Sequence, residues 1–523
     1  MKTPILGQTY VARSVNAAAA RMVNLFPEII PEGGKEHAWL QRCPGLRYVT
    51  NVSESGPVSD NGPVRGMWVY GGVLYVVVSD GLYKLDPVTY APTSLGYIPG
   101  TNLVSMADNG TQLFIASNGP SYIWNNKTAT FKQIVDPDFP GALTVGFIDG
   151  YFVFNEPNSQ TIWVTSLYDG SSIDPLDFAS AEGNPDNVVA LIVDHREVWV
   201  FGTNTVEVWY NEGGTADFPL TRVQGAFNEF GLAAAFSPAK LDNRLFWLGS
   251  DQRGQGVVYA ATGYIGQRIS THAVEWAIQS YGDLSDAIGF SYQQDGHSFY
   301  VLTFPSANDG LGATWCYDVA TNSWHERASW VDDKFGRHRS NCQAAYNNQI
   351  LVGSCTDARI FALDPTVYSD DDAVQKWLRS WRALEPGKND LKRTAHHSLQ
   401  LDCETGTEAG PLIEVSTDLL ATQALDFITT EDGRPLLLRQ ERRSSPGPAN
   451  PEVMLRWSDD GGHTWSNEHW RSMGRIGEYG FRTYWRRLGM TVKLRDRVYE
   501  VSGTDPVKIA IMGAELHGSP TAS

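Results

Sequence analysis

Cysteine is scarce in this chain of 523 residues, which holds five, and no two of them form a CxxC pair. A dispersed, odd-numbered set fits neither a zinc site nor a secreted disulfide framework, and it indicates assembly in a reducing compartment. Long apolar runs are also missing: none approaches the ~18–20 residues that cross a bilayer, and the N-terminus lacks the apolar core of a signal peptide. We therefore expect a soluble protein, without membrane insertion, that is not exported by its own signal.

Catalytic motifs are missing as well. The chain contains no HExxH, GxSxG, phosphate-binding loop or GxGxxG. Carboxylate pairs such as Asp174 with Asp177, or Asp332 with Asp333, invite a glycosidase hypothesis, because that chemistry needs two carboxyl groups ~5–9.5 Å apart. With 59 acidic residues, however, such pairs are expected by chance. We predict no catalytic residue, no metal site and no cofactor.

Charged residues make up only 19% of the chain, and they are unevenly placed. Residues 1–370 hold 21 Lys and Arg against 37 Asp and Glu, a net charge of −16, whereas residues 371–523 hold 20 against 22, a net charge of −2. An acidic surface repels nucleic acid, which excludes a general DNA-binding protein that works through residues 1–370. Two interpretations stay open: a solvated surface without a function, or an acidic channel wall along which a polyanion slides without sticking.

Aromatic residues are abundant, with 17 Trp, 22 Tyr and 21 Phe, and many of them lie in repeated hairpins. Seven copies of two short strands around a polar turn begin at Val64, Leu103, Thr144, Val188, Leu241, Ala287 and Arg339. Successive starts lie 39, 41, 44, 53, 46 and 52 residues apart. A period of roughly 40–50 residues filled with strands is typical of propeller blades. We predict an all-β protein with a six- or seven-bladed β-propeller over residues 57–368.

The two ends of the chain lack this repeat. Residues 1–56 contain four prolines and a Gly33-Gly34 pair, so we expect an extended N-terminal arm in which only residues 16–26 form about two helical turns. Such an arm lies along the body of the protein or reaches onto a neighbour. Residues 369–523 are predicted to form a C-terminal antiparallel β domain, a platform for contacts, which opens with a helix over residues 371–384.

Residues 458–465, SDDGGHTW, match the Asp-box pattern S-x-D-x-G-x-T-W at every fixed position. In such a turn carboxylate and hydroxyl groups bond to main-chain amides, glycines accept positive φ, and the tryptophan is expected to fill the core below. The matching residues are Ser458, Asp460, Gly462, Thr464 and Trp465. Asp-boxes are familiar from sialidases, which are also propellers, but a sialidase would repeat the box and carry an Arg trio. We interpret this single box as a structural turn.

The run from residue 471 to residue 497 concentrates arginine beside aromatic residues. Arginine in this setting is typical of protein interfaces and of phosphate contacts, because its guanidinium group stacks on rings and forms bidentate pairs. The candidates are Arg471, Arg475, Arg482, Arg486, Arg487, Arg495 and Arg497. Three partners stay open: the acidic propeller of the same chain, an acidic neighbouring protein, or DNA. We predict a protein interface here.

Several strings in a shared order resemble one family, the packaged-DNA stabilisation or tail hub (nozzle) proteins of short-tailed phages (podoviruses). They are NLFPE from Asn24, PGL from Pro44, WVFG from Trp199, TVEVWY from Thr205, RISTHAVE from Arg268, and the residues Ala181, Glu182 and Asp186. The resemblance extends over residues 15–365 and more loosely over the C-terminal domain. Within its opening strings, Asn24, Phe26, Pro27 and Pro44 are candidate contacts of the arm.

This resemblance implies a structural protein of the virion tail with no catalytic residues. It implies a ring, usually a hexamer, beneath the portal and its tail adaptor (head-to-tail connector) protein. Such a ring extends the DNA channel, retains the packaged genome and supports a tail needle, fibres or spikes. Double-stranded DNA would pass through it without sequence-specific binding, and assembly would take place in the bacterial host cytoplasm. The alternatives are a sialidase-like propeller glycoside hydrolase acting on surface glycans and a ligand-binding propeller of a host cell.

Overall fold

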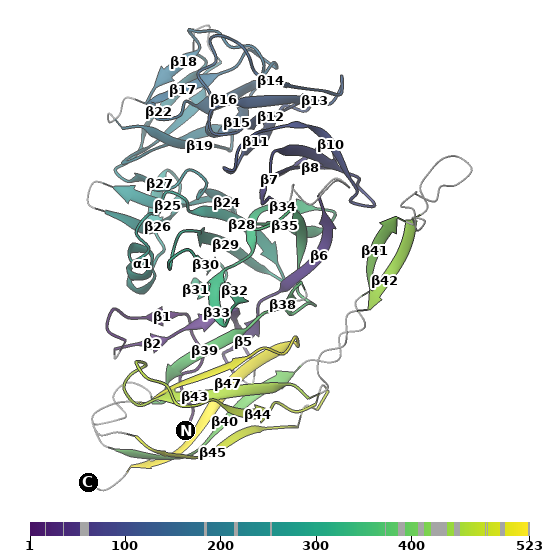
Figure 1. Ribbon diagram of the computed structural model, residues 1–523. Coiled ribbons are helices and arrows are strands. Elements are labelled where there is room, and N and C mark those ends of the chain that lie inside the picture. Colours follow the sequence, from purple (N-terminus) through teal and green to yellow (C-terminus); the bar gives the residue numbers. More distant parts are fainter. Residues whose placement is uncertain are drawn as a thin grey trace.

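The computed structural model describes the chain except for residues 16, 35, 53–61, 182–185, 214–217, 252–253, 372, 385–392, 406–412, 420–436, 444–449, 476, 479, 492–496 and 521–523. The described residues form 47 β-strands and one α-helix. The molecule has two main parts, a propeller and a smaller β-sandwich, and the N-terminus and the last strand both lie in the sandwich (Figure 1).

The propeller has seven blades within the described residues, each built on an antiparallel sheet of four strands. The first blade consists of β7 (Val64–Tyr70), β8 (Val73–Val78), β9 (Gly81–Leu85) and β10 (Pro92–Tyr97), and the second of β11 (Ser105–Asp108), β12 (Gln112–Ala116), β13 (Ser121–Asn125) and β14 (Thr130–Gln133). The third blade consists of β15 (Val145–Ile148), β16 (Tyr151–Asn155), β17 (Thr161–Val164) and β18 (Phe178–Ser180). The fourth consists of β19 (Val188–Asp194), β20 (Glu197–Gly202), β21 (Val206–Asn211) and β22 (Leu220–Asn228).

The other three are β23 (Gly231–Leu232) with β24 (Ala239–Leu241), β25 (Arg244–Asp251), β26 (Gly254–Thr262) and β27 (Ile265–Arg268); β28 (Ile288–Gln294), β29 (His297–Phe304), β30 (Ala313–Asp318) and β31 (Ser323–Glu326); and β34 (Ser340–Tyr346), β35 (Gln349–Ser354), β36 (Arg359–Asp364) and β6 (Gly45–Asn51). In the fifth blade the inner strand is divided, since β23 and β24 both pair with β25. Each of the seven predicted hairpins lies in its own blade, so the predicted β-propeller is confirmed.

Tight turns between the first two strands of each blade explain why the sequence repeats so regularly. In six blades two consecutive residues of this turn have positive φ: Gly71 and Gly72, Asp149 and Gly150, His195 and Arg196, Asp242 and Asn243, Asp295 and Gly296, and Asn347 and Asn348. Two such residues make a type I′ turn, whose twist matches that of the flanking strands and which Gly, Asn and Asp tolerate best. Only His195 and Arg196 depart from this preference. Their side chains bond to neighbouring blades, His195 Nε2 to Asn243 Oδ1 at 2.6 Å and Arg196 Nη2 to Asp149 Oδ1 at 2.7 Å.

The propeller is closed by the N-terminal segment. Strand β6 pairs antiparallel with β36, so residues from the start of the chain complete a blade whose other three strands lie about 300 residues later. An ion pair of 2.7 Å between Arg47 Nε and Asp364 Oδ2 accompanies this register. Closure joins both ends of the repeat, so the described sheets of the ring present only the short outer strands of single blades as edges.

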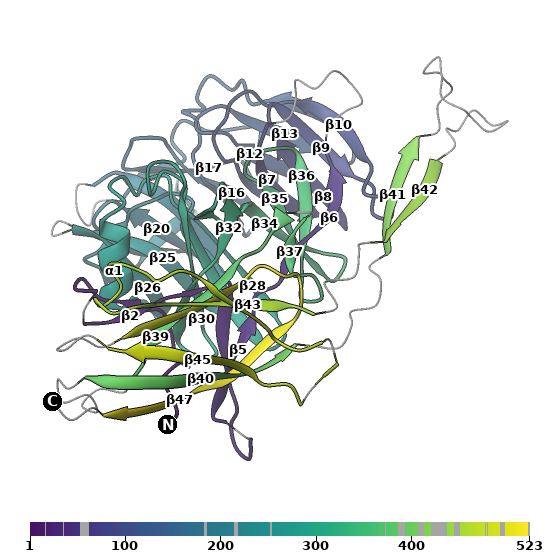
Figure 2. The ribbon, with the colours of Figure 1, turned by 60° about the horizontal axis from the view of Figure 1, so that its bottom comes forward.

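The sandwich consists of two facing sheets, each of five strands. One sheet has the order β4 (Leu25–Ile29), β5 (Ala38–Arg42), β47 (Ile509–Pro520), β40 (Thr394–Thr405), β45 (Thr483–Met490), and the other has the order β3 (Met22–Val23), β39 (Trp377–Arg382), β46 (Val498–Gly503), β43 (Glu452–Ser458), β44 (His469–Ser472). Figure 2 shows β40 between β45 and β47 in the first of these sheets. Trp377, Trp381, Trp485 and Tyr499 are buried in the core between the sheets.

A two-residue strand joins the two parts of the molecule. Strand β3 pairs with β31 of the sixth blade on one side and with β39 of the sandwich on the other. The sixth blade and one face of the sandwich therefore form a single nine-stranded sheet. The N-terminus also enters the sandwich, because Thr3 N donates to Ala514 O at 2.9 Å and Ile5 is fully buried.

Both predicted helices are wrong. Residues 16–26 contain β3 and the strands beside it, and Trp377–Arg382 forms β39 at the centre of a sheet. Strand β39 is buried on both faces, so its sequence does not alternate between apolar and polar residues. The spacing of its apolar residues therefore resembles that of a helix. The one helix of the described residues is α1 (His272–Gln279), which is neither long nor apolar enough to cross a membrane.

Four further pairs of short strands complete the described elements. They are β1 (Tyr10–Val11) with β2 (Ala19–Ala20), β32 (Ala328–Val331) with β33 (Lys334–Arg337), β37 (Ser369–Asp370) with β38 (Ala373–Val374), and β41 (Ile413–Leu419) with β42 (Leu437–Arg443). The pair β37 and β38 extends the seventh blade beyond β6, which brings the start of the C-terminal domain onto the propeller.

Candidate functional site

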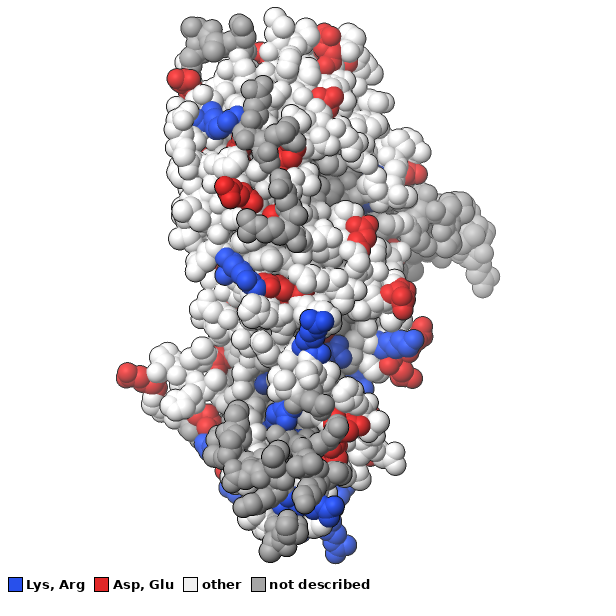
Figure 3. Space-filling view, turned by 90° about the vertical axis from the view of Figure 1, so that its left-hand side faces the viewer, with Lys and Arg blue, Asp and Glu red and all other residues white. Residues whose placement is uncertain are grey.

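The arginine-rich run forms the outer edge of the sandwich. Strands β44 and β45 are the last strands of their two sheets, on the side opposite the N-terminal strands β3 and β4. Five of the predicted arginines are exposed along this edge: Arg471, Arg475, Arg482, Arg486 and Arg487. We call these five residues the Arg edge. Figure 3 shows Lys and Arg gathered at the sandwich end of the molecule, while Asp and Glu are scattered over the propeller above it.

None of the five side chains of the Arg edge forms an ion pair with a carboxylate in the described part of the chain. The acidic propeller of the same chain is therefore not their partner there. Large apolar side chains are exposed beside them, with Trp470 45% exposed, Phe481 38% and Met490 51%. Arginine next to exposed aromatic rings is the composition of a protein interface rather than of an ordinary solvated surface.

Two residues of the predicted interface differ from the other five. Arg495 lies outside the described residues. The prediction is wrong for Arg497, whose side chain is only 2% exposed inside the sandwich. Its Nε and Nη2 donate to Asp459 Oδ1 and Oδ2 at 2.7 and 2.9 Å, and its Nη2 also reaches Met490 O at 3.2 Å. The sequence offered no signal for this difference, because the partners of Arg497 come from other strands.

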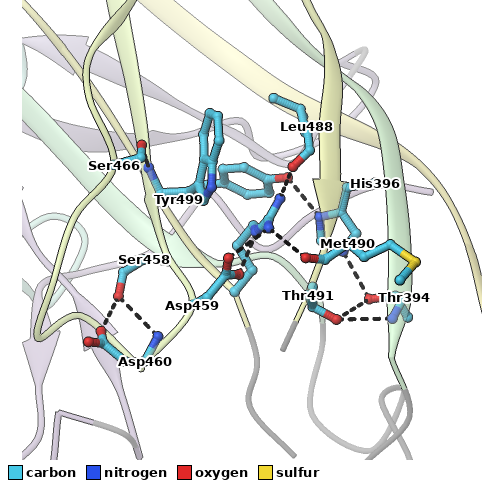
Figure 4. A network of polar contacts seen from close by, with 12 residues as sticks. Thr394, His396, Ser458, Asp459, Asp460, Ser466, Leu488, Met490, Thr491 and Tyr499 are labelled. Carbon is cyan, nitrogen blue, oxygen red and sulfur yellow. Dashed lines mark hydrogen bonds and ion pairs between the residues drawn. The ribbon is translucent and has the colours of Figure 1, made fainter. Parts of the chain in front are cut away.

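The guanidinium group of Arg497 belongs to a buried polar network that ties the two sheets together (Figure 4). On the far side of the network, His396 Nδ1 lies 2.7 Å from Tyr499 Oη, and Thr394 Oγ1 lies 3.1 Å from His396 Nε2. Burial lowers the pKa of His396 to about 4, so the imidazole is neutral at pH 7.

The Asp-box is a turn held by its own side chains. Asp460 Oδ1 accepts from the main-chain N–H groups of His463 and Thr464 at 2.9 Å each, and Ser458 Oγ accepts from Gly462 N at 2.7 Å. Hydrogen bonds from the Ser458 and Thr464 hydroxyls hold the pKa of Asp460 well below its usual range. Gly462 has a φ of 109°, a conformation that glycine adopts readily.

Trp465 does not fill the core as expected. It is half-buried, and the guanidinium group of Arg456 lies 4.8 Å from its ring centroid. A Cβ atom on Gly462 would approach Val15 Cγ1 to 2.9 Å, so the turn packs on the N-terminal hairpin instead. The box therefore supports the position of the N-terminal segment.

The predicted arm contacts are made within the chain, at the junction between propeller and sandwich. Asn24 has a φ of 54° and is 1% exposed; its Nδ2 donates to Ala328 O and to Lys376 O at 2.8 Å each, and its Oδ1 accepts from Ala328 N at 3.0 Å. One amide side chain thus binds the strand after the sixth blade and the strand that enters the sandwich. Phe26 packs edge-on against Phe299 in the sixth blade, with ring centroids 5.4 Å apart.

Pro27 and Pro44 have different positions near this junction. Pro27 lies in β4 opposite Leu40. Pro44 O accepts from Arg327 Nη2 at 2.9 Å and from Gln375 Nε2 at 3.1 Å. Sequence reasoning missed Arg327, because its partners, Pro44 O and the Tyr292 hydroxyl, are far away in the sequence and leave no local signal.

A cavity of about 690 Å³ lies on the propeller axis, and the inner strands of all seven blades line it. Asp108 is the one carboxylate among its lining residues, and its Oδ2 accepts from Trp68 Nε1 at 2.8 Å. Arg65 has a structural role, since its guanidinium group donates to the main-chain carbonyls of Ser79 and Ile98. The two carboxylates that a glycosidase needs are not found among these lining residues. In the described part of the chain no group of three His, Cys, Asp or Glu side chains is placed to hold a metal ion.

Replacing Asn24 tests the junction. Asn24→Ala removes three buried hydrogen bonds and places a Cβ-bearing residue without a polar side chain at positive φ, so we expect a loss of about 3 kcal/mol in the free energy of unfolding. Asn24→Gly keeps the backbone conformation, and we expect it to lose about 1 kcal/mol less. Urea unfolding followed by tryptophan fluorescence measures both. Wild-type stability in both variants would show that the junction does not depend on this side chain.

Replacing Arg497 tests the network of Figure 4. Arg497→Met leaves Asp459 and two main-chain carbonyls without their donor, and we expect a loss of about 3 kcal/mol. The matched control is Arg487→Met, which alters an exposed arginine of the same sandwich and should change stability by less than about 0.5 kcal/mol. Equal effects of the two substitutions in urea unfolding would contradict the structural role of Arg497.

The network also predicts that the free energy of unfolding depends on pH. Because the pKa of His396 is lowered from 6.5 to about 4 by burial, the unfolded chain binds a proton that the folded chain does not. The contribution of His396 to stability is therefore complete above pH 6.5 and is lost as the pH falls toward 4. His396→Gln should reduce the proton uptake on unfolding by up to one, as measured from urea midpoints between pH 7 and pH 4. If the slope of the free energy of unfolding against pH is the same in this variant as in the wild type, His396 does not bind the extra proton on unfolding. Part of this slope remains in the variant, because burial also lowers the pKa of His325, to about 3.

Two family models match this chain. The model described as Bacteriophage P22 Gp10, beta-propeller, matches residues 1–368, and the model described as Bacteriophage P22 Gp10, beta-sandwich, matches residues 423–519. The first covers more than half of the chain and spans the N-terminal segment together with all seven blades. No curated protein matches the chain.

Three solved structures are similar to the chain at low sequence identity. A chain in the crystal structure of the mitotic checkpoint complex is 10% identical with a TM-score of 0.39, and 65% of this chain and 97% of that one are covered. The extracellular domain of a putative one component system from B. thetaiotaomicron is 13% identical with a TM-score of 0.40, over 89% of this chain and 58% of that one. The N-terminal domain of Nup159 is 9% identical with a TM-score of 0.37, over 64% and 97%. Because these TM-scores are below 0.5, nothing further rests on them.

The family matches agree with the observed architecture in both parts, a propeller followed by a β-sandwich. They also agree with the resemblance of the N-terminal strings and of the blade sequences. The chain therefore belongs to the phage P22 Gp10 family of packaged-DNA stabilisation and tail hub proteins, and it is a structural component of a phage tail.

Proposed function

We propose that six copies of this tail protein form a ring below the portal and its adaptor protein. The ring extends the DNA channel, retains the packaged genome and supports a tail needle, fibres or spikes. The observation that carries the proposal is the Arg edge, where exposed guanidinium groups and aromatic rings have no carboxylate partner in the described part of the chain. Such a surface is stabilised when an acidic protein surface covers it.

The rigidity of the subunit supports this role. The propeller is closed by β6, and the sixth blade continues into the sandwich as one nine-stranded sheet. A subunit of fixed shape repeats the same contact angle at each step, which is what allows identical copies to close into a ring.

The charge distribution supports passage of DNA. The net charge of −16 over residues 1–370 disfavours stable contact with phosphates, so double-stranded DNA moves along the channel without sequence-specific binding. The single carboxylate lining the axial cavity favours a structural role over glycan hydrolysis. The five cysteines are free in the described structure, which is consistent with assembly in the reducing cytoplasm of the bacterial host.

Charge reversal on the Arg edge tests the ring. We expect Arg486→Glu with Arg487→Glu to lower the fraction of rings on portal–adaptor complexes at least tenfold, because the new carboxylates repel an acidic partner. Electron microscopy of the full-length chain mixed with portal–adaptor complexes measures the sixfold density below the portal. Urea unfolding of the same variant should match the wild type, since both side chains are exposed.

The matched control is Lys127→Glu with Lys334→Glu, which changes the net charge equally at two exposed positions outside the sandwich. This control should assemble like the wild type. Normal incorporation of the Arg486 and Arg487 variant would show that the Arg edge is not an interface, and a wild-type chain without sixfold density would overturn the ring itself.

A further inference from the structure

Large apolar side chains are exposed in the second and third blades. These blades lie at the end of the propeller remote from the sandwich (Figure 1). Val135 is 84% exposed, Leu176 68% and Phe178 43%. Val135 lies in the segment after β14, Leu176 lies in the segment before β18, and Phe178 is the first residue of β18. Exposed apolar groups are common singly, but a group of them rimmed by polar residues marks an interaction surface.

Two exposed carboxylates, those of Asp138 and Asp174, accompany these residues. Neither forms an ion pair within the described residues. We call Val135, Asp138, Asp174, Leu176 and Phe178 the acidic loop surface.

Hydrogen bonds fix the shape of the acidic loop surface. Asp136 Oδ2 accepts from Ile173 N at 3.2 Å, which ties the segment after β14 to the segment before β18. Asp136 Oδ1 accepts from Asp138 N at 3.0 Å, and Asp174 Oδ1 accepts from Leu176 N at 3.0 Å. The surface is therefore ordered before any partner arrives, which lowers the entropic cost of binding.

The acidic loop surface and the Arg edge are complementary in both charge and apolar content. One presents carboxylates beside aliphatic side chains, and the other presents guanidinium groups beside Trp470 and Phe481. They lie at opposite ends of the molecule, because β18 is at the far end of the propeller and β45 is at the far edge of the sandwich (Figure 1). The continuous nine-stranded sheet holds these ends apart, so one chain cannot bring them together.

We propose that the Arg edge of one copy docks on the acidic loop surface of the next copy. This inference rests on the ring proposed above and names the surface that receives the Arg edge. Arginine pairs with aspartate through two parallel hydrogen bonds, while the aromatic rings cover the aliphatic side chains and exclude water. The contact uses two different surfaces, so it is heterologous, and its repetition generates a ring rather than a closed dimer.

Two variants test the docking in mixtures. The edge variant carries Trp470→Ser, Arg475→Ala and Arg482→Ala, and the loop variant carries Val135→Ser, Asp138→Asn and Leu176→Ser. All six side chains are exposed, so both variants should fold like the wild type in urea unfolding. We expect each variant alone to associate at least tenfold more weakly than the wild type in analytical ultracentrifugation of the full-length chain.

The mixture gives the decisive result. In a 1:1 mixture the intact Arg edge of the loop variant meets the intact loop surface of the edge variant, so we expect dimers but no rings. A control with Val88→Ser, Ile265→Ser and Asp309→Asn changes exposed residues of the same kinds elsewhere and should still form rings. Higher salt should weaken the wild-type contact, because exposed charge pairs are screened.

The possible failures are distinguishable. If the loop variant forms rings like the wild type while the edge variant does not, the ring stands and the proposed docking surface is wrong. If the two variants remain monomers in the mixture, the contact is not heterologous and the docking is again overturned. If the edge variant forms normal rings, the Arg edge itself is not an interface, and the proposed function loses its main support.

Discussion

Main-chain pairing by the first 51 residues is the constraint on which the rest of this structure depends. Strand β6 completes the seventh blade, β3 joins the sixth blade to the sandwich, and the residues before β1 extend a sandwich sheet. Each pairing supplies hydrogen-bond partners to backbone N–H and C=O groups that would otherwise be buried without one. The propeller ring and the sandwich core thus share one segment, and neither is complete without it.

Buried arginines make this shared junction rigid through hydrogen bonds to main-chain carbonyls. Arg42 donates to the carbonyls of Val507 and Tyr368, and Arg379 donates to Ile5 O at 2.6 Å. Their partners are main-chain carbonyls rather than carboxylates, so each guanidinium group fixes the path of a segment as well as its own position. A junction held by such directional bonds changes shape less than one held by apolar contacts alone.

Local features of this fold were predictable from the sequence, and features that depend on distant partners were not. Turns such as Asp295-Gly296 and the strands around them are encoded within about 15 residues, so all seven hairpins were found, while the blade count was predicted only as six or seven. Strand β39 was mistaken for a helix because its burial on both faces arises only from the neighbouring strands. Arg497 and Arg486 belong to the same arginine-rich run, yet one is enclosed by Asp459 and the other is exposed, since that difference is set by tertiary packing.

Because the propeller and the sandwich share the N-terminal segment, neither part can complete its folding early during synthesis on the ribosome. Residues 1–51 are synthesised first, but their partner strands β31, β36, β39 and β47 come hundreds of residues later. At translation rates of ~5–20 residues per second, the segment waits roughly half a minute to a minute and a half for its last partner. During that time six blades acquire their own strands, and the ring can close once β36 has been made. The synthesis of β47, the last of these partner strands, therefore sets the moment at which the sandwich sheet can be completed.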